Sequence, residues 1–147
     1  MGKDSKELLL LNDLYARIPY GVKICYTEHE YGVKSTWTID YIIPELEQIV
    51  TKHPYGKFSI KDIRPYLRPM SSMTEEEIRE IKAMGFAYWI TMINNDLRSS
   101  GPMSLLDAII THHKMVKLFD WLNKKMFDYR GLIEKGLALE APKGMYI

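Results

Sequence analysis

The sequence predicts an α+β fold, in which a small, bent antiparallel sheet in the N-terminal half packs with helices from the C-terminal half. Alternating apolar and polar side chains indicate strands in the first half, and two capped stretches indicate helices in the second. The chain has 147 residues, of which 46% are hydrophobic, which is enough for one core. We therefore expect a single domain, 1–147, with a β-rich half, 5–73, and a helical half, 74–147. An SH3-like sheet is one arrangement that fits the first half.

The β-rich half begins with a short helix at residues 5–17. Leu8, Leu11 and Tyr15 fall three and four residues apart, so they share one face of a helix with 3.6 residues per turn. Pro19 follows the segment and ends it, because proline cannot continue the hydrogen bonding of a helix interior.

A hairpin of two strands follows this helix. Residues 22–27 alternate between apolar and polar side chains, which indicates a half-buried strand. Residues 33–43 are rich in β-branched and aromatic side chains and predict the return strand. Strict alternation assigns Trp37, Ile39 and Tyr41 to one face, which we expect to join the core.

The rest of the β-rich half gives mixed signals. Residues 44–50 suit either a helix start or a strand, and this choice stays open. Residues 57–60 predict a strand after a Tyr-Gly turn. Residues 63–73 contain two prolines, and residues before proline avoid the helical region, so we expect extended chain there.

The helical half contains two helix starts of the capping-box type. Thr74 and Glu77 begin a helix that we place at 75–84, and Ser104 begins another that we carry to residue 125. The apolar run 86–93 between them suits either a strand or a helix. We place a loop at 94–102, assign Trp89 and Phe119 to the core, and expect a single turn between Gly131 and Gly136.

Bulk composition excludes several classes of protein. The net charge is +1, which excludes a strongly basic nucleic-acid coat but not a local charged patch. The single cysteine, Cys25, excludes an internal disulfide and a four-cysteine zinc site. No apolar stretch approaches the roughly 20 residues of a membrane span. We therefore expect a protein of the reducing cytoplasm, without membrane contact.

No catalytic or metal-binding motif stands out in the sequence. His112 and His113 are adjacent, and adjacent helical side chains point about 100° apart, so we expect them to be structural. Cys25 suits a small apolar strand residue better than a nucleophile. We expect no catalytic residue, no metal and no cofactor, and we favour a protein that is not an enzyme.

Five residues are candidates for a binding site. Arg64, Tyr66 and Arg68 alternate in a proline-flanked stretch, and Tyr129 and Arg130 lie near the C-terminus. Interleaved arginine and tyrosine suit contact with phosphates and stacking on bases. The same tyrosines suit protein contact, because large amphipathic rings are enriched in interfaces. Tyr55, Tyr66, Tyr129 and Tyr146 lie in extended, turn or terminal stretches, where we expect any recognition surface.

Two segments resemble a known group of proteins. PYLRPMSSMTEEE, 65–77, and FDYRGLIEKGLALEAPKGMY, 127–146, are similar to segments of short proteins encoded by gut Bacteroides-type bacteria, their phages and prophages. Residues 86–126 depart from the shorter members of that group. The resemblance implies a phage or mobile-element context and no particular activity, so it assigns no functional residue.

Three functions follow as hypotheses. The first is a non-enzymatic protein-interaction or accessory module that binds a protein partner or a second copy of itself. The alternative is a nucleic-acid-binding regulator that uses Arg64, Tyr66 and Arg68. The second alternative is a small-nucleotide-binding protein or an enzyme whose site has no recognised motif.

Overall fold

The fold is α+β, as the sequence predicts. A computed structural model describes the chain at residues 5–27, 32, 34–52, 54–86 and 105–146. The chain forms two compact units. The first consists of Met1–Met70 together with Asn123–Ile147, and the second consists of Ser71–Leu122. The C-terminal segment therefore belongs with the sheet and not with the helices that precede it. That the whole chain is one domain stays a prediction.

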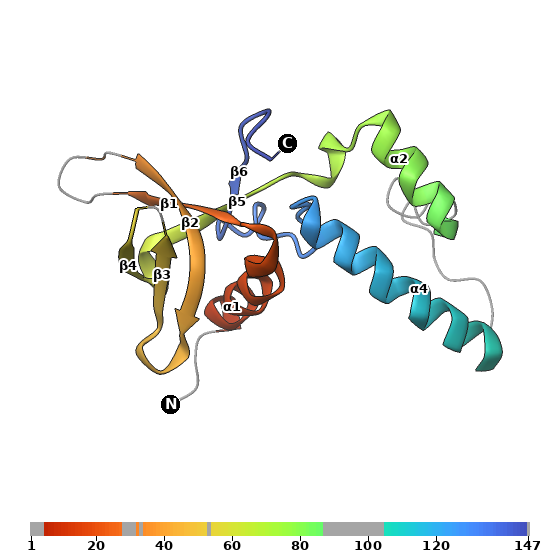
Figure 1. Ribbon diagram of the computed structural model, residues 1–147, viewed down its shortest axis with the longest axis horizontal. Helices are drawn as coiled ribbons and strands as arrows, with labels where there is room; N and C mark the ends of the chain where they lie inside the picture. Colours follow the sequence, from red (N-terminus) through yellow and green to blue (C-terminus); the bar gives the residue numbers. More distant parts are fainter. Residues whose placement is uncertain (1–4, 28–31, 33, 53, 87–104, 147) are drawn as a thin grey trace. The chain divides into compact units, whose positions relative to one another are not determined.

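The first unit contains a six-stranded sheet in the order β4-β3-β2-β1-β5-β6 (Figure 1). Its first five strands pair antiparallel, whereas β5 and β6 are parallel. The expectation of a purely antiparallel sheet was wrong at this edge, because a strand from the C-terminal tail joins it. The strands are β1 (Lys23–Thr27), β2 (Lys34–Ile43), β3 (Gln48–Lys52), β4 (Gly56–Ser59), β5 (Ile63–Leu67) and β6 (Leu139–Glu140).

A β-bulge in β2 changes which side chains face the core. Ile39 pairs with Thr51 and Tyr41 pairs with Val50, so Asp40 is an extra residue without a partner in β3. Because the extra residue shifts the alternation, Trp37 and Ile39 face inward and Tyr41 faces outward. Tyr41 is 47% exposed, so its assignment to the core was wrong.

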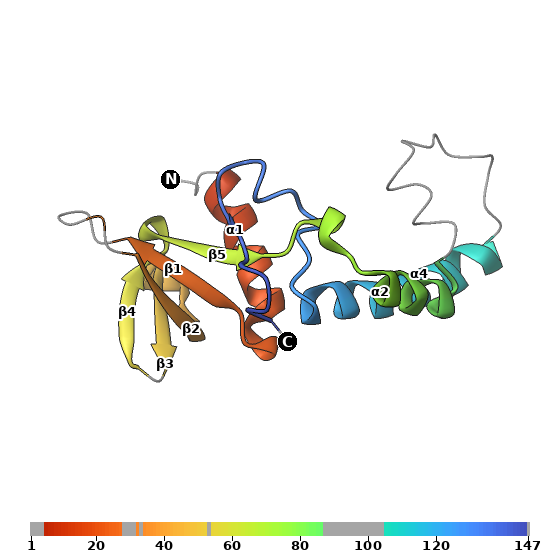
Figure 2. The same ribbon diagram turned by 90° about the horizontal axis from the view of Figure 1, so that it is seen from above.

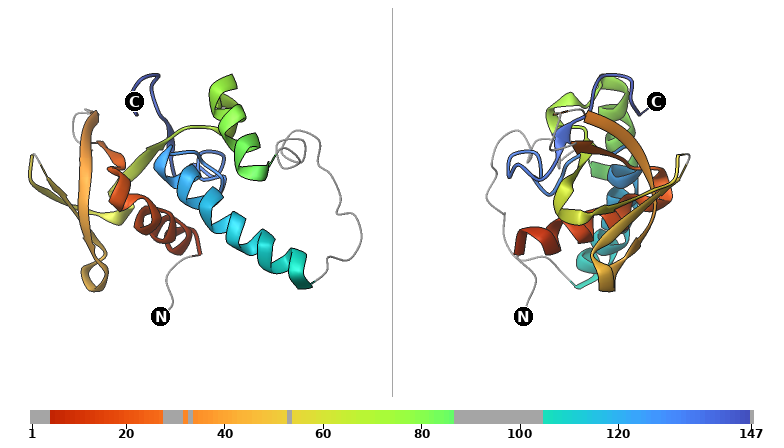
Figure 3. Two further views of the ribbon diagram at one scale, coloured as in Figure 1. Left: turned by 45° about the vertical axis from the view of Figure 1, so that its right-hand side comes forward. Right: turned by 90° about the vertical axis from the view of Figure 1, so that its left-hand side faces the viewer.

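Helix α1 (Ser5–Arg17) covers one face of this sheet (Figures 1 and 3). Leu10, Leu11 and Leu14 enter the same core cluster as the inward residues of β1, β2 and β5. The face that carries Leu8 and Tyr15 is exposed, since the helix is rotated so that Leu10 and Leu14 point at the sheet. The inner side of the sheet is therefore closed by α1.

The ambiguous segment 44–50 contains a helical turn followed by a strand. Pro44 begins the one-turn 3-10 helix η2 (Pro44–Leu46), and Glu47 then takes the left-handed backbone conformation, with φ of 52°. The chain continues directly as β3. Residues 63–73 are extended through β5, as the two prolines predict, and then form the 3-10 turn η4 (Met70–Ser72).

The described residues of the second unit form the helices α2 and α4. Helix α2 (Glu75–Ile81) begins at the predicted capping box, in which the Thr74 hydroxyl accepts from the Glu77 N–H and the Glu77 carboxylate accepts from the Thr74 N–H. Regular α-helix ends at residue 81 and not at 84, because a π-type turn, η5 (Lys82–Phe86), follows, with Gly85 at φ of 94°. Helix α4 (Leu105–Lys124) presents Trp121, whose indole N–H donates to Glu80 of α2 at 2.8 Å.

Several predictions fall on other parts of the chain. The loop at 94–102, the apolar run after residue 86 and the core position of Trp89 lie outside the described residues. The same holds for the side chain of His112.

The C-terminal tail, residues 125–146, runs beside α1 and β5 without forming a helix (Figure 2). Its path is fixed by backbone hydrogen bonds, because the Arg68 N–H donates to the Met126 carbonyl and the Asp128 N–H donates to the Arg68 carbonyl. The Asp128 carboxylate then accepts the N–H groups of Leu132 and Ile133 at 2.8 and 2.9 Å. This carboxylate stabilises the tight turn that the sequence predicts between the two glycines.

A buried carboxylate joins α1 to the tail. Asp13 accepts two hydrogen bonds from Arg17, at 2.9 and 3.0 Å, and one from Arg130 at 2.7 Å. Arg17 also donates to the Phe127 carbonyl at 2.7 Å. Asp13 and Arg17 are both fully buried, so neither charge can be solvated by water if its partner is removed.

We predict that Asp13→Ala lowers the free energy of unfolding by about 3–5 kcal/mol, because it leaves the Arg17 guanidinium buried without a counter-charge. Urea titration followed by circular dichroism measures the loss. The matched control is Arg79→Ala, which removes the same type of pair from α2, where both side chains are exposed. We expect that change to be close to zero. Equal effects of the two substitutions would contradict the prediction.

Candidate functional site

Three of the five residues that the sequence singles out hold the tail in place. The Arg68 guanidinium lies 4.1 Å from the centre of the Phe127 ring. Two guanidiniums contact the Tyr129 ring, whose centre lies 5.4 Å from Arg17 and 4.6 Å from Arg130. These stacking contacts are the kind that the arginine and tyrosine pattern suggests for nucleic acid, but here they are made within the chain.

The other two candidates, Arg64 and Tyr66, lie on the side of the sheet that faces away from α1. Arg64 pairs with Cys25 in β1, which pairs in turn with Thr36 in β2. Side chains at directly paired positions lie on the same face of a sheet, and so do alternate residues along one strand. This register therefore defines a surface, which we call the outer face.

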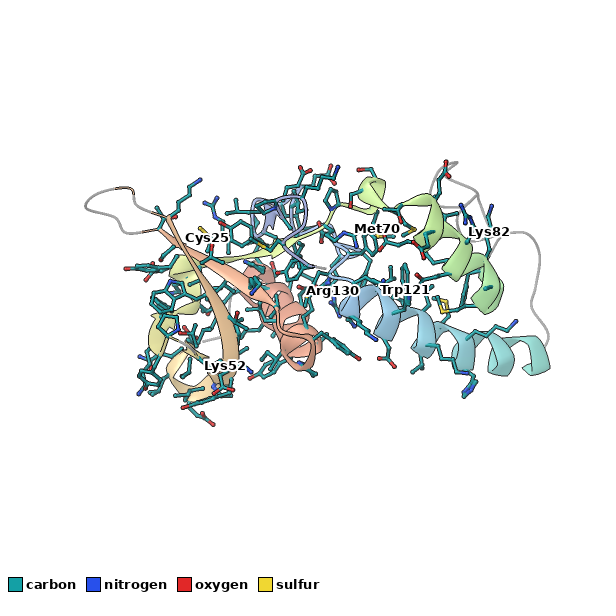
Figure 4. All side chains as sticks on the ribbon, turned by 45° about the horizontal axis from the view of Figure 1, so that its top comes forward. Cys25, Lys52, Met70, Lys82, Trp121 and Arg130 are labelled. Atoms are coloured by element: carbon teal, nitrogen blue, oxygen red, sulfur yellow. The ribbon has the colours of Figure 1, made fainter. Side chains whose placement is uncertain are left out.

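The outer face consists of rows of paired side chains. One row places Thr38 between Lys23 and Lys52. Tyr66 lies two residues after Arg64 on β5 and is joined to Lys23 through the Tyr146 hydroxyl. The Lys23 ammonium donates to the Thr38 hydroxyl at 3.4 Å. Figure 4 labels Cys25 and Lys52 on their strands. The members of the outer face are Lys23, Cys25, Thr27, Lys34, Thr36, Thr38, Tyr41, Ile43, Gln48, Val50, Lys52, Lys57, Ser59, Arg64, Tyr66 and Leu139.

The charge on the outer face is of one sign. It holds five cations, and none of its paired positions holds a carboxylate. Lys34, Lys52 and Arg64 are exposed and form no ion pair with any described residue. Two nearby carboxylates lie outside the paired positions: Asp40 is the extra residue of the bulge, and Asp62 precedes β5. The outer face is therefore a local positive patch on a chain of almost zero net charge.

The centre of the outer face is a cluster of neutral polar groups. A hydrogen bond with Cys25 and, secondarily, burial raise the pKa of the Tyr66 phenol, while a hydrogen bond with Thr36 opposes the rise. The phenol is therefore protonated at neutral pH and can donate a hydrogen bond. Cys25 itself is buried beneath its neighbours and acts here as a small strand residue, as expected.

Tyr146 in the tail joins β1 to β5 at the edge of this cluster. Its hydroxyl accepts from the Lys23 N–H at 2.9 Å and donates to the Tyr66 carbonyl at 2.8 Å. The two strands are last paired at Ile24 and Pro65, one residue before this point. The hydroxyl thus substitutes for the next ladder bond, and it fixes the backbone of two outer-face residues.

Local sequence patterns reveal only a small part of the outer face. Alternation in residues 22–27 already places Lys23 and Thr27 on the face of Cys25. The pairing of Lys34 and Lys52 with these residues depends on register, which no local pattern reveals. Tyr41 reaches this face only through the bulge.

The chain matches no family model, no curated protein and no solved structure. Within the described residues there is no group of three or more histidine, cysteine or acidic side chains that could hold a metal ion. No described helix is both long and apolar enough to cross a membrane.

We predict that Tyr146→Phe removes part of the loss of stability at alkaline pH. Burial raises the pKa of the Tyr146 phenol from 10.0 to about 12 in the folded chain. Between pH 10 and 12 the unfolded chain therefore binds fewer protons than the folded one, so the free energy of unfolding falls as pH rises. The stability that comes from the raised pKa of Tyr146 is fully present below pH 10 and is lost above about pH 12. Urea titrations from pH 8 to 12 measure it.

At pH 8 the same substitution should lower the free energy of unfolding by about 1–3 kcal/mol, because the Lys23 N–H and the Tyr66 carbonyl lose their partner. The control is Tyr55→Phe, which changes an exposed phenol and should keep both the stability at pH 8 and the alkaline fall. A parallel alkaline fall in Tyr146→Phe and the unsubstituted chain would refute the role of this hydroxyl.

Proposed function

We propose that the chain binds nucleic acid across the outer face of its sheet. The observation that carries the proposal is the strand register. It gathers five cations and two tyrosines on the outer face, and no paired position of that face holds a carboxylate. Phosphate contacts dominate the affinity of proteins for nucleic acid, and lysine and arginine supply them. Arg64 and Tyr66 keep the binding role that the sequence suggested. Arg68, Tyr129 and Arg130 have internal roles instead.

The near-zero net charge is compatible with this proposal. Exposed charges farther apart than the Debye length, about 8 Å at physiological salt, are largely screened from one another. A phosphate at the outer face therefore responds mainly to the cations of that face. Two carboxylates elsewhere in the first unit have partners of their own: Asp13 pairs with two arginines, and Asp128 accepts two backbone N–H groups.

The hydroxyl groups of the outer face extend the set of phosphate ligands. Thr27, Thr36 and Thr38 lie between the cations, and threonine hydroxyls donate to phosphate oxygens in many complexes. Such contacts position a backbone without reading its sequence. We therefore propose binding with little base specificity.

A protein-interaction or accessory module of phage or mobile-element origin is the second candidate. It is favoured by Leu8 and Tyr15, which lie seven residues apart on the exposed side of α1. The tyrosines first expected to form such a surface support it less, because Tyr129 and Tyr146 have internal hydrogen-bond partners.

We predict that the double variant Lys34→Gln/Arg64→Gln binds nucleic acid more weakly and with a shallower salt dependence. Each phosphate contact contributes about 0.7–0.9 to the slope of log K against log salt, so the slope should fall by about 1.5. Fluorescence anisotropy with labelled DNA and RNA oligonucleotides measures the affinity and its salt slope. The salt concentration is varied from about 25 to about 300 mM, a range over which counterion release changes the affinity strongly.

The control is Lys135→Gln/Lys143→Gln, which removes the same charge from exposed positions in the tail. It should leave the slope almost unchanged, because those lysines are not on the outer face. If neither DNA nor RNA binds the unsubstituted chain at the lowest salt, the proposal fails and the second candidate takes its place.

A further inference from the structure

We infer that the nucleic acid taken by the outer face is single-stranded, with unpaired bases stacking on Tyr41 and Tyr66. This inference rests on the proposed function and names its substrate class. The cations alone would serve double-stranded or single-stranded nucleic acid. The two tyrosines are evidence independent of the cations, because binding of phosphates does not need aromatic rings.

Tyr41 is presented to solvent by a specific feature of the sheet. The bulge at Asp40 places it on the same face as Thr38 and Lys52, although it is three residues from Thr38 along the strand. The other aromatic residue of β2, Trp37, packs against the core, whereas the Tyr41 ring is 47% exposed and offers an apolar face on the sheet surface. A base has an apolar face that would cover such a ring.

Tyr66 is held in a fixed position. Its phenol interacts with Cys25 and Thr36, and its carbonyl accepts from the Tyr146 hydroxyl. A ring restrained at both its side chain and its backbone loses little further freedom when a base stacks on it. Tyr66 is only half-buried, so part of its surface remains available.

The cations are placed to follow a strand of phosphates past these rings. Lys57 shares a row with Tyr41, and Lys23 is linked to Tyr66 through the Tyr146 hydroxyl. Alternate residues on a strand are about 6.8 Å apart, and neighbouring strands about 4.8 Å. A flexible backbone can adjust to such a grid, whereas the phosphates of a duplex are fixed by its helix.

A duplex fits the outer face less well. Its bases are already stacked on one another, so their faces are closed to tyrosine rings. Reading a duplex through the major groove requires an inserted helix or two-stranded ribbon, because the groove is about 12 Å wide and 8.5 Å deep. The outer face instead carries short threonine side chains between its cations. A duplex would gain phosphate contacts only.

The test compares a 12-nucleotide oligothymidylate with a 12-base-pair duplex, using Tyr41→Leu and Tyr41→Phe, in anisotropy titrations at one low salt concentration. These lengths lie within the roughly 4–16 nucleotides that one OB fold, a small β domain that binds single strands, covers. We expect Tyr41→Leu to weaken single-strand binding about tenfold and Tyr41→Phe to preserve it, since phenylalanine still stacks. Duplex binding should be weaker and change less than about twofold, because it does not use the ring.

The matched control is Tyr15→Leu, because Tyr15 is 46% exposed and Tyr41 is 47% exposed, but Tyr15 lies on α1. It should change neither affinity, and thermal unfolding confirms that each variant is folded. Equal affinity for the two probes, with no effect of Tyr41→Leu, would overturn this inference and leave nucleic-acid binding intact. Absence of binding to both probes would instead overturn the proposed function.

Discussion

The buried carboxylate of Asp13 is the constraint on which the first unit depends. It neutralises Arg17 inside α1 and reaches Arg130 in the tail, while Arg17 also holds the Phe127 carbonyl. A buried ion pair contributes little net stability compared with apolar packing, but an unpaired buried charge is very costly. A different path for the tail would take Arg130 from Asp13 and the Phe127 carbonyl from Arg17, which would leave each buried group short of one partner. Helix α1 and the tail are fixed together by this requirement.

The consequence reaches the opposite side of the sheet. Once Phe127 and Asp128 are fixed beside Arg68, the tail can pair along β5 and bring Tyr146 to the gap between β1 and β5. Its hydroxyl sets the spacing of Lys23 and Tyr66, which belong to the outer face. The inner network and the candidate binding surface are thus coupled through one strand pair. This coupling between the Asp13 network and the outer face requires no conformational change, because the folded tail itself fixes the positions of Lys23 and Tyr66.

The sequence predicted those features that depend on neighbours in the chain. Helix α1, the capping box at Thr74 and the alternating strands all follow from local periodicity and hydrogen bonding. Tyr41 was misplaced because strict alternation cannot detect a bulge, whose cause lies in the pairing with β3. The contact of Arg130 could not be predicted for a related reason, because its partner Asp13 is 117 residues away. Arginine and tyrosine have the same chemistry toward a base and toward each other, so only the fold decides which contact they make.

This division also explains why composition concealed the outer face. Net charge sums over all side chains, whereas binding depends on charges within about one Debye length of the ligand. The fold separates the two signs. Carboxylates such as Asp13, Glu77 and Asp128 stabilise buried networks, helix caps and turns, and Lys34, Lys52 and Arg64 remain exposed on the sheet. Strand register performs this separation, because each paired position adds its charge to one face. A balanced sequence can therefore fold into a sheet face whose paired positions carry only positive charge.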